Sequence, residues 1–195
     1  IMRIAIIDYG AGNTQSVKYA LKRLGCNGML TSEKEVISSA DKIIFPGVGQ
    51  ASSAMNMLKS KGLDLLIPEL KQPVLGICLG MQLMCSFSEE GKTDCLKIFD
   101  SNVKRFNNSL KVPQIGWNTV FDLKTNLFDS IIENEYMYLV HSYYVPIIKD
   151  TVAKSNYGIN YSSAIKKNNF TGVQFHPEKS GGKGEVILNN FINNS

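Results

Sequence analysis

The chain has 195 residues, 44% of them hydrophobic, and a formal net charge of +4. This length predicts one globular domain over residues 1–195 with a single core. No apolar run approaches the roughly 18 residues of a membrane span, the start of the chain lacks a signal-peptide pattern, and the basic pairs are short and scattered. We therefore expect a cytoplasmic protein that binds neither a membrane nor nucleic acid.

The first half of the sequence alternates between apolar β-type runs and segments with helical periodicity. Each run ends in glycine, proline or polar residues, which is typical of parallel strands joined by helices. Strands are predicted at 3–9, 28–31, 42–45 and 73–77, and helices at 14–24, 50–59, 63–70 and 79–87. Asn13 or Thr14 is expected to cap the first helix, which Gly25 ends.

The second half is richer in β signals and closes with a helix. Strands are predicted at 117–121, 136–144, 151–155, 162–167 and 170–174, followed by a helix at 184–193. The predicted fold is α/β, a mostly parallel open sheet of flavodoxin-like type with helices on both faces and an antiparallel β extension. In such sheets, sites lie beyond the carboxyl ends of the strands.

Cofactor and metal patterns are weak in this sequence. The GAGNTQ segment at 10–15 lacks the third glycine of a dinucleotide fingerprint, so we predict no nicotinamide site and no other cofactor. The two histidines are not in a metal-binding array, and no metal site is expected. The cysteines show no paired spacing and are predicted to be reduced thiols. They are Cys26, Cys78, Cys85 and Cys95. Ile1 precedes the methionine and is given no role.

Cys78 is the best candidate for a nucleophile. It lies between Ile77 and Leu79, close to Gly76 and Gly80, where a buried strand should give way to a helix. A sharp turn at that point exposes the sulfur, and the first N–H groups of the helix favour a thiolate and can bind an oxyanion. A buried cysteine after an apolar strand is also an ordinary core residue, and this motif alone does not decide between the two.

His176 and Glu178 supply the rest of a predicted triad. Pro177 favours an extended conformation at His176, and residues two apart in an extended chain share a face. A carboxylate beside an imidazole fixes its tautomer and stabilises its protonated form. Together with Cys78, these residues indicate nucleophilic catalysis with a cysteine, a histidine base and an orienting carboxylate.

These motifs resemble class I, triad-type glutamine amidotransferases and, among them, the family of glutaminase subunits of imidazole glycerol phosphate synthase. The cysteine and HPE motifs are typical of the whole class, whereas DYGAGN and GWN resemble that subunit in particular. The resemblance spans nearly the whole chain and depends on DYGAGN at 8–13, PGVG at 46–49, GICLGMQ at 76–82, VPQIGWN at 112–118, VHSYY at 140–144 and GVQFHPEKS at 172–180. One departure is Gln114, where this family often carries histidine.

The resemblance implies hydrolysis of L-glutamine to glutamate and ammonia through a thioester on Cys78. The ammonia would pass to a (β/α)₈ barrel cyclase subunit in a heterodimer of histidine biosynthesis. It also implies roles for three further sets of residues. These are an oxyanion hole of Leu79, Gly47, Val48 and Gly49; glutamine contacts at Gln82, Glu90, Ser142 and Tyr143; and a partner face of Tyr9, Gly10, Asn13, Trp117, Asn118, Tyr136 and Tyr138.

Several alternatives stay open on the sequence. Gln82 and Glu90 could equally be surface polar residues, Trp117 a core residue and His141 a structural histidine. At the level of function, a paralogue could feed ammonia to another synthase, for example one that forms an amidino sugar. A stand-alone γ-glutamyl hydrolase would use the same triad without a partner, and a silent binding subunit would not need the triad. We also expect glutaminase activity to be low in the isolated chain and to rise on complex formation.

Overall fold

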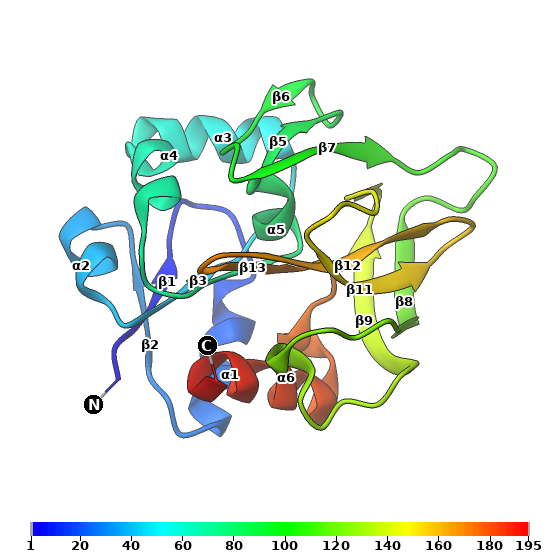
Figure 1. Ribbon diagram of the computed structural model, residues 1–195. Coiled ribbons are helices and arrows are strands. Elements are labelled where there is room, and N and C mark those ends of the chain that lie inside the picture. Colours follow the sequence, from blue (N-terminus) through cyan, green and yellow to red (C-terminus); the bar gives the residue numbers. More distant parts are fainter. Residues whose placement is uncertain (1, 195) are drawn as a thin grey trace.

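A computed structural model describes residues 2–194 as an α/β protein with a central sheet (Figure 1). Ile1, to which we gave no role, and Ser195 lie outside the described residues. The first half contains β1 (Ile4–Ile7), α1 (Thr14–Arg23), β2 (Gly28–Thr31), α2 (Lys34–Ser39), β3 (Lys42–Phe45), α3 (Ala51–Ser60), α4 (Leu63–Leu66), the 3₁₀ turn η1 (Ile67–Glu69), β4 (Val74–Ile77) and α5 (Leu79–Leu83).

The second half adds short β elements and the last helix. It contains β5 (Cys85–Ser88), β6 (Thr93–Asp94), β7 (Phe99–Arg105), β8 (Gln114–Val120), η2 (Asn126–Phe128), β9 (Glu135–His141), β10 (Tyr143–Tyr144), β11 (Thr151–Asn156), β12 (Asn160–Lys167), β13 (Phe170–Val173), η3 (Pro177–Lys179) and α6 (Gly181–Asn194).

The central sheet has the strand order β11-β12-β13-β4-β3-β1-β2. The five strands from β13 to β2 are parallel, and β12 and β11 extend the sheet antiparallel. This confirms the predicted mostly parallel sheet with an antiparallel extension. Four of these parallel strands, β1, β3, β4 and β13, are buried on both faces, as expected for strands covered by helices on either side, whereas the edge strand β2 is partly exposed.

Two apolar cores lie on opposite faces of this sheet. Successive residues of a strand point to opposite sides, so Ala5 and Ile7 enter one core while Ile4 and Ile6 enter the other. The first core lies under α3, α4 and α5, and the second under α1, α6 and the β8–β9 hairpin (Figure 1). Helices therefore cover both faces.

The chain around α5 corrects the sequence prediction. We expected a helix over 79–87, but α5 ends at Leu83 and β5 begins at Cys85. β5 pairs with β6 and β7. The carbonyl of Leu83, the last residue of α5, accepts a hydrogen bond from Leu96 N–H. The pairing with these two strands outweighs the helical periodicity of the segment. Three elements, α2, β6 and β7, were not predicted, because each is short or polar on one side.

Other boundaries differ by smaller amounts. The expected side-chain cap at the start of α1 is absent from the structure, where Ser16 Oγ instead donates to Asn13 Oδ1. The predicted strand over 136–144 is interrupted after His141, so that β9 and β10 join different sheets.

The carboxyl ends of β3 and β4 bring two loops into close contact. A Cβ atom on Gly80 would lie 1.9 Å from the carbonyl oxygen of Phe45, at the end of β3. Only glycine permits this approach of backbone to backbone. The loop of residues 46–49 is thereby held against the start of α5, next to Cys78.

Candidate active site

Cys78 occupies a strained turn between β4 and α5. Its φ is +53° and its ψ is −111°, a conformation that costs a non-glycine residue roughly 1–3 kcal/mol. Cys78 N–H donates to the carbonyl of Val173 on β13 at 2.8 Å, which ties the turn to the neighbouring strand. The predicted sharp turn is thus present. The side chain is largely buried but lines a cavity of about 270 Å³.

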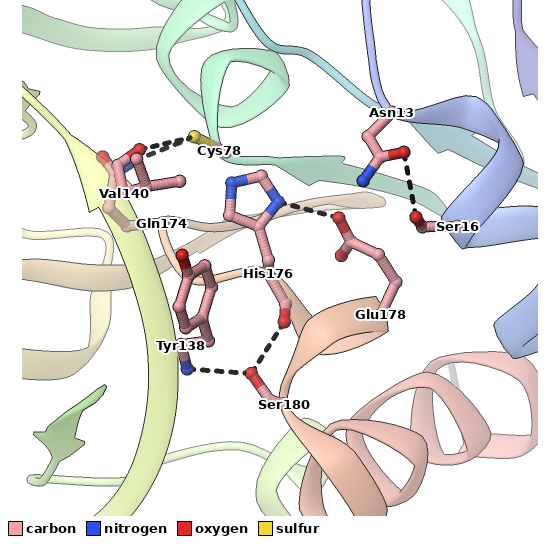
Figure 2. A network of polar contacts seen from close by, with 9 residues as sticks. All are labelled: Asn13, Ser16, Cys78, Tyr138, Val140, Gln174, His176, Glu178 and Ser180. Carbon is pink, nitrogen blue, oxygen red and sulfur yellow. Dashed lines mark hydrogen bonds and ion pairs between the residues drawn. The ribbon is translucent and has the colours of Figure 1, made fainter. Parts of the chain in front are cut away.

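His176 lies between Cys78 and Glu178, so the three predicted residues come together in the structure (Figure 2). His176 Nδ1 is 2.7 Å from Glu178 Oε1, and the other ring nitrogen, Nε2, points toward Cys78 (Figure 2). His176 Nε2 and Glu178 Oε2 are buried and have no hydrogen-bond partner among residues 2–194. The route to this geometry differs from the prediction. The chain is extended only to His176, and Glu178 is brought back by the 3₁₀ turn η3.

The electrostatics of the site favour a protonated His176. Burial alone lowers the pKa of this imidazole, but the nearby charge of Cys78 and the hydrogen bond and charge of Glu178 more than offset burial. The net result is a pKa well above the ordinary histidine value. A negative sulfur and a negative carboxylate on either side of the ring therefore stabilise an imidazolium.

The loop of residues 46–49 contacts the first turn of α5 through a backbone hydrogen bond. Leu79 N–H, a predicted oxyanion donor, donates to the carbonyl of Gly47 at 3.3 Å. Gly49 has a φ of +99° and is exposed, as is Val48. In this conformation the Leu79 N–H is already hydrogen-bonded within the protein and is not free to bind an oxyanion.

Four predicted glutamine contacts line the same cavity as Cys78 and His176: Gln82, Glu90, Ser142 and Tyr143. Gln82 is not a surface residue, since only 4% of it is exposed and its Nε2 donates to the carbonyl of Tyr143 at 2.9 Å. Glu90 Oε2 accepts from Ala51 N–H at 2.9 Å, and burial raises the pKa of Glu90 despite that bond. Both side chains are therefore held in place at the cavity wall.

His141 is buried beneath the Ser142–Tyr143 segment. Its Nδ1 is 2.7 Å from the carbonyl of Tyr143, and its Nε2 is 3.0 Å from the side-chain amide of Gln114. Burial, followed by the charge of His176, lowers the pKa of His141 to about 4. A neutral His141 thus donates to Tyr143 and supports the backbone that lines the cavity.

The predicted partner-face residues fall into two groups. Trp117 and Tyr136 are 55% and 58% exposed, so Trp117 is not a core residue, and Tyr138 packs edge-on against Trp117 at 6.0 Å. Gly10 is exposed, while Asn13 and Asn118 are half-buried. The prediction that Tyr9 belongs to the partner face was wrong. Its ring is fully buried, because β1 carries it into the core against Phe45, and so it cannot offer a contact surface.

Tyr9 instead supports the loop beside Cys78. Its hydroxyl donates to the carbonyl of Pro46 at 2.8 Å. Burial, with a smaller effect from the charge of Cys78, raises the pKa of the Tyr9 hydroxyl well above its usual range, which keeps the hydroxyl a donor.

Strand β9 connects the exposed aromatic residues Trp117 and Tyr136 to the Cys78–His176 pair. Tyr138 N–H donates to Ser180 Oγ, and Ser180 Oγ–H donates to the carbonyl of His176 (Figure 2). His176 N–H in turn donates to the carbonyl of Tyr138 at 2.9 Å. Two residues further along the strand, the carbonyl of Val140 lies 3.8 Å from Cys78 Sγ. The backbone of β9 therefore contacts both the histidine and the cysteine.

Gln174 is a site residue that the sequence analysis missed. It is fully buried, and its side-chain amide lies 3.7 Å from Cys78 Sγ. The signal was available, because Gln174 precedes His176 by two residues in an extended segment and so shares its face.

No group of three or more histidine, cysteine, aspartate and glutamate residues within the described part of the chain is placed to hold a metal ion. Among the same residues, no helix combines the length and apolar character needed to cross a membrane. The four cysteines are free thiols.

The fold and the cysteine, histidine and glutamate geometry define a class of enzyme. Residues 5–194 match the family described as glutamine amidotransferase class-I, and the chain belongs to this family. Solved structures agree on the fold. A putative GMP synthase protein from Thermoplasma acidophilum has a TM-score of 0.76 at 21% identity, covering 98% of this chain and 92% of that one. A Thermotoga maritima PurLQS structure has a TM-score of 0.72 at 16% identity, covering 99% and 98%.

Within the family, the curated relatives are more specific. The imidazole glycerol phosphate synthase subunit HisH of Bacteroides fragilis strain YCH46 is 56% identical over 194 residues, covering 98% of this chain and 99% of its own. The HisH subunit of Haemophilus influenzae strain KW20 is 50% identical over 194 residues, with 98% of each chain covered. The chain is therefore a member of the HisH branch of the class-I glutamine amidotransferases.

Proposed function

We propose that this protein hydrolyses L-glutamine and delivers the ammonia to a (β/α)₈ barrel cyclase that makes imidazole glycerol phosphate in histidine biosynthesis. The observation that carries the proposal is the arrangement of Cys78, His176 and Glu178 at one cavity in a chain 56% identical to a HisH subunit. Residues 1–195 act as a single amidotransferase domain that works as a heterodimer in the cytoplasm, where its free thiols stay reduced.

The first half of the reaction forms a thioester. With the proton of Cys78 held on His176 Nε2, the thiolate attacks the side-chain carbonyl carbon of glutamine. Glu178 accepts the Nδ1–H bond and stabilises the imidazolium. As the tetrahedral intermediate collapses, His176 gives its proton to the leaving nitrogen, the C–N bond breaks and ammonia departs.

The second half regenerates the thiol. His176, now neutral, takes a proton from a water molecule as its oxygen attacks the thioester carbon. The C–S bond breaks, glutamate leaves and Cys78 recovers its proton from His176. Throughout, Gln82, Glu90 and the N–H groups of Ser142 and Tyr143 hold the substrate in the cavity.

Oxyanion stabilisation is the step that a partner controls in this proposal. Leu79 N–H and an N–H from the 47–49 loop are the donors, and the Leu79 donor first has to lose its bond to the Gly47 carbonyl. The glycines on either side of Val48 allow that peptide to reorient. Without the donor we expect turnover to fall on the order of a hundredfold to a thousandfold.

The partner face consists of Gly10, Asn13, Trp117, Asn118, Tyr136 and Tyr138. Large exposed aromatic side chains are typical anchors of protein interfaces. A barrel bound here contacts β9. The backbone of this strand is hydrogen-bonded to His176 N–H, and its Val140 carbonyl lies 3.8 Å from Cys78 Sγ. This gives binding at the surface a short physical path to the catalytic residues.

The experiment that tests the chemistry is to trap the intermediate. Wild-type protein is mixed with L-glutamine, quenched in acid and digested, and the peptide that contains Cys78 is examined by mass spectrometry. A γ-glutamyl thioester on that peptide, lost in His176→Gln and absent at Cys26, is the expected result. Steady glutamate release with no adduct on Cys78, or an adduct elsewhere, would overturn the assigned nucleophile.

A further inference from the structure

Two buried glutamine side chains connect the wall of the cavity to the sulfur of Cys78. Gln82 Nε2 donates to the carbonyl of Tyr143 and to Gln174 Oε1, both at 2.9 Å. Gln174 Nε2 lies 3.7 Å from Cys78 Sγ (Figure 2). Gln174 is fully buried, and Gln82 is nearly so.

The network fixes which end of each amide faces which neighbour. The carbonyl of Tyr143 can only accept, so Gln82 must direct its NH₂ group toward it. The same NH₂ group meets Gln174, which must therefore present its oxygen to Gln82. Gln174 is left with its NH₂ group toward Cys78 Sγ. A donor at the sulfur is thus a consequence of the surrounding hydrogen bonds.

The sulfur has different best partners before and after it loses its proton. As a thiol it can donate to the carbonyl of Val140 at 3.8 Å. As a thiolate it has no proton to donate, and that carbonyl oxygen becomes repulsive, whereas the NH₂ group of Gln174 becomes a charge-assisted donor. Gln174 therefore favours the thiolate over the thiol.

We propose that Gln174 is a further positioning residue, which stabilises the Cys78 thiolate through its side-chain NH₂ group and is itself held in orientation by Gln82. The inference deepens the proposed function, since it concerns the nucleophile of that reaction. Gln82 also lines the glutamine cavity, so one side chain contacts the substrate and orients the donor to the sulfur.

The test measures the sulfur directly. Cys78 is alkylated with iodoacetamide across a pH series and followed peptide by peptide, in wild type, Gln174→Met and Gln174→Glu. Methionine matches the size of glutamine but donates no bond. Glutamate keeps the oxygen that Gln82 binds, loses the donor and adds a negative charge. Gln72→Met is the matched control, because Gln72 is a half-buried glutamine before β4, at the opposite end of that strand from Cys78.

A hydrogen bond to a charged group contributes about 1.5–3 kcal/mol, which corresponds to about one to two pH units in the midpoint of alkylation. We expect that shift to higher pH in Gln174→Met, a larger one in Gln174→Glu, and none in Gln72→Met. Below both midpoints, where the alkylation rate follows the thiolate fraction, alkylation of Cys78 should then slow roughly tenfold to a hundredfold. A purely structural role would change the plateau rate but leave the midpoint in place.

An unchanged midpoint in either folded Gln174 variant overturns the proposal. The glutamate variant keeps the bond to Gln82, so the test stands even when the methionine variant does not fold. The alkylation readout needs no glutamine. A wild-type protein that failed to release glutamate would therefore count against the proposed function, and the midpoint comparison would still decide the role of Gln174.

Discussion

Replacing Glu178 with glutamine removes a charge next to His176 while keeping the shape of the side chain. The second carboxylate oxygen, Oε2, has no hydrogen-bond partner among the described residues, so nothing fixes the new amide in one orientation. Its carbonyl oxygen can face Nδ1–H and preserve the histidine tautomer. What is lost is the difference between a charge-assisted and a neutral hydrogen bond, about 1–2 kcal/mol. We expect kcat/KM for glutamine to fall roughly fivefold to thirtyfold.

The assay is glutamate release by the partner-activated protein, with Glu178→Ala as the control. Alanine leaves the buried Nδ1–H without an acceptor, so we expect a larger loss than with glutamine. A loss on the order of 10⁴ in Glu178→Gln, the size seen in serine-protease triads when an amide reverses the tautomer, would refute this reasoning. Equal losses in the two variants would also refute it.

Three further predictions follow from the same geometry. In the presence of the cyclase, Cys78→Ala should abolish glutamine-dependent synthesis but leave ammonia-dependent synthesis intact; loss of both would contradict a role confined to ammonia release. Gly80→Ala places a Cβ atom 1.9 Å from the Phe45 carbonyl oxygen and should lower the free energy of unfolding, measured in urea, by about 1–3 kcal/mol or more. Gly182→Ala, whose Cβ atom meets nothing within 4 Å, should not lower it. Similar effects of the two substitutions would show that the close approach is unimportant. The folded pKa of His141, about 4, lies below the ordinary 6.5, so its neutral form contributes stability above pH 6.5 that is lost as the pH falls toward 4, by up to about 1.4 kcal/mol per pH unit. Unfolding measured across that range should show this slope in the wild type and a flatter one in His141→Gln; equal slopes would contradict the assignment.

Much of the fold is predictable because it depends on local signals. The strands that became β1 to β4 are apolar runs bounded by turn residues, and the position of Cys78 at the end of one of them predicts the sharp turn. The second half of the segment at 79–87 was predicted wrongly, because its periodicity is helical while the strands β6 and β7 that pair with it lie outside the segment.

The side chains around Cys78 were predictable in part. The short spacing of His176 and Glu178 indicates their pairing, although the 3₁₀ turn that achieves it was not foreseen. The burial of Tyr9 depends on the whole packed core and has no local signature. The amide network through Gln82 and Gln174 joins residues 92 positions apart, which a reading of neighbouring residues cannot detect.

The most direct test of the central claim is glutamate release from L-glutamine by the purified protein, alone and with a purified histidine-pathway cyclase barrel carrying its nucleotide ligand. We expect slow release by the isolated chain, where the Gly47 carbonyl occupies the Leu79 N–H, and strong stimulation by the barrel. Fast release by the isolated chain that the barrel does not change would contradict the partner-gated site, and would indicate a stand-alone hydrolase.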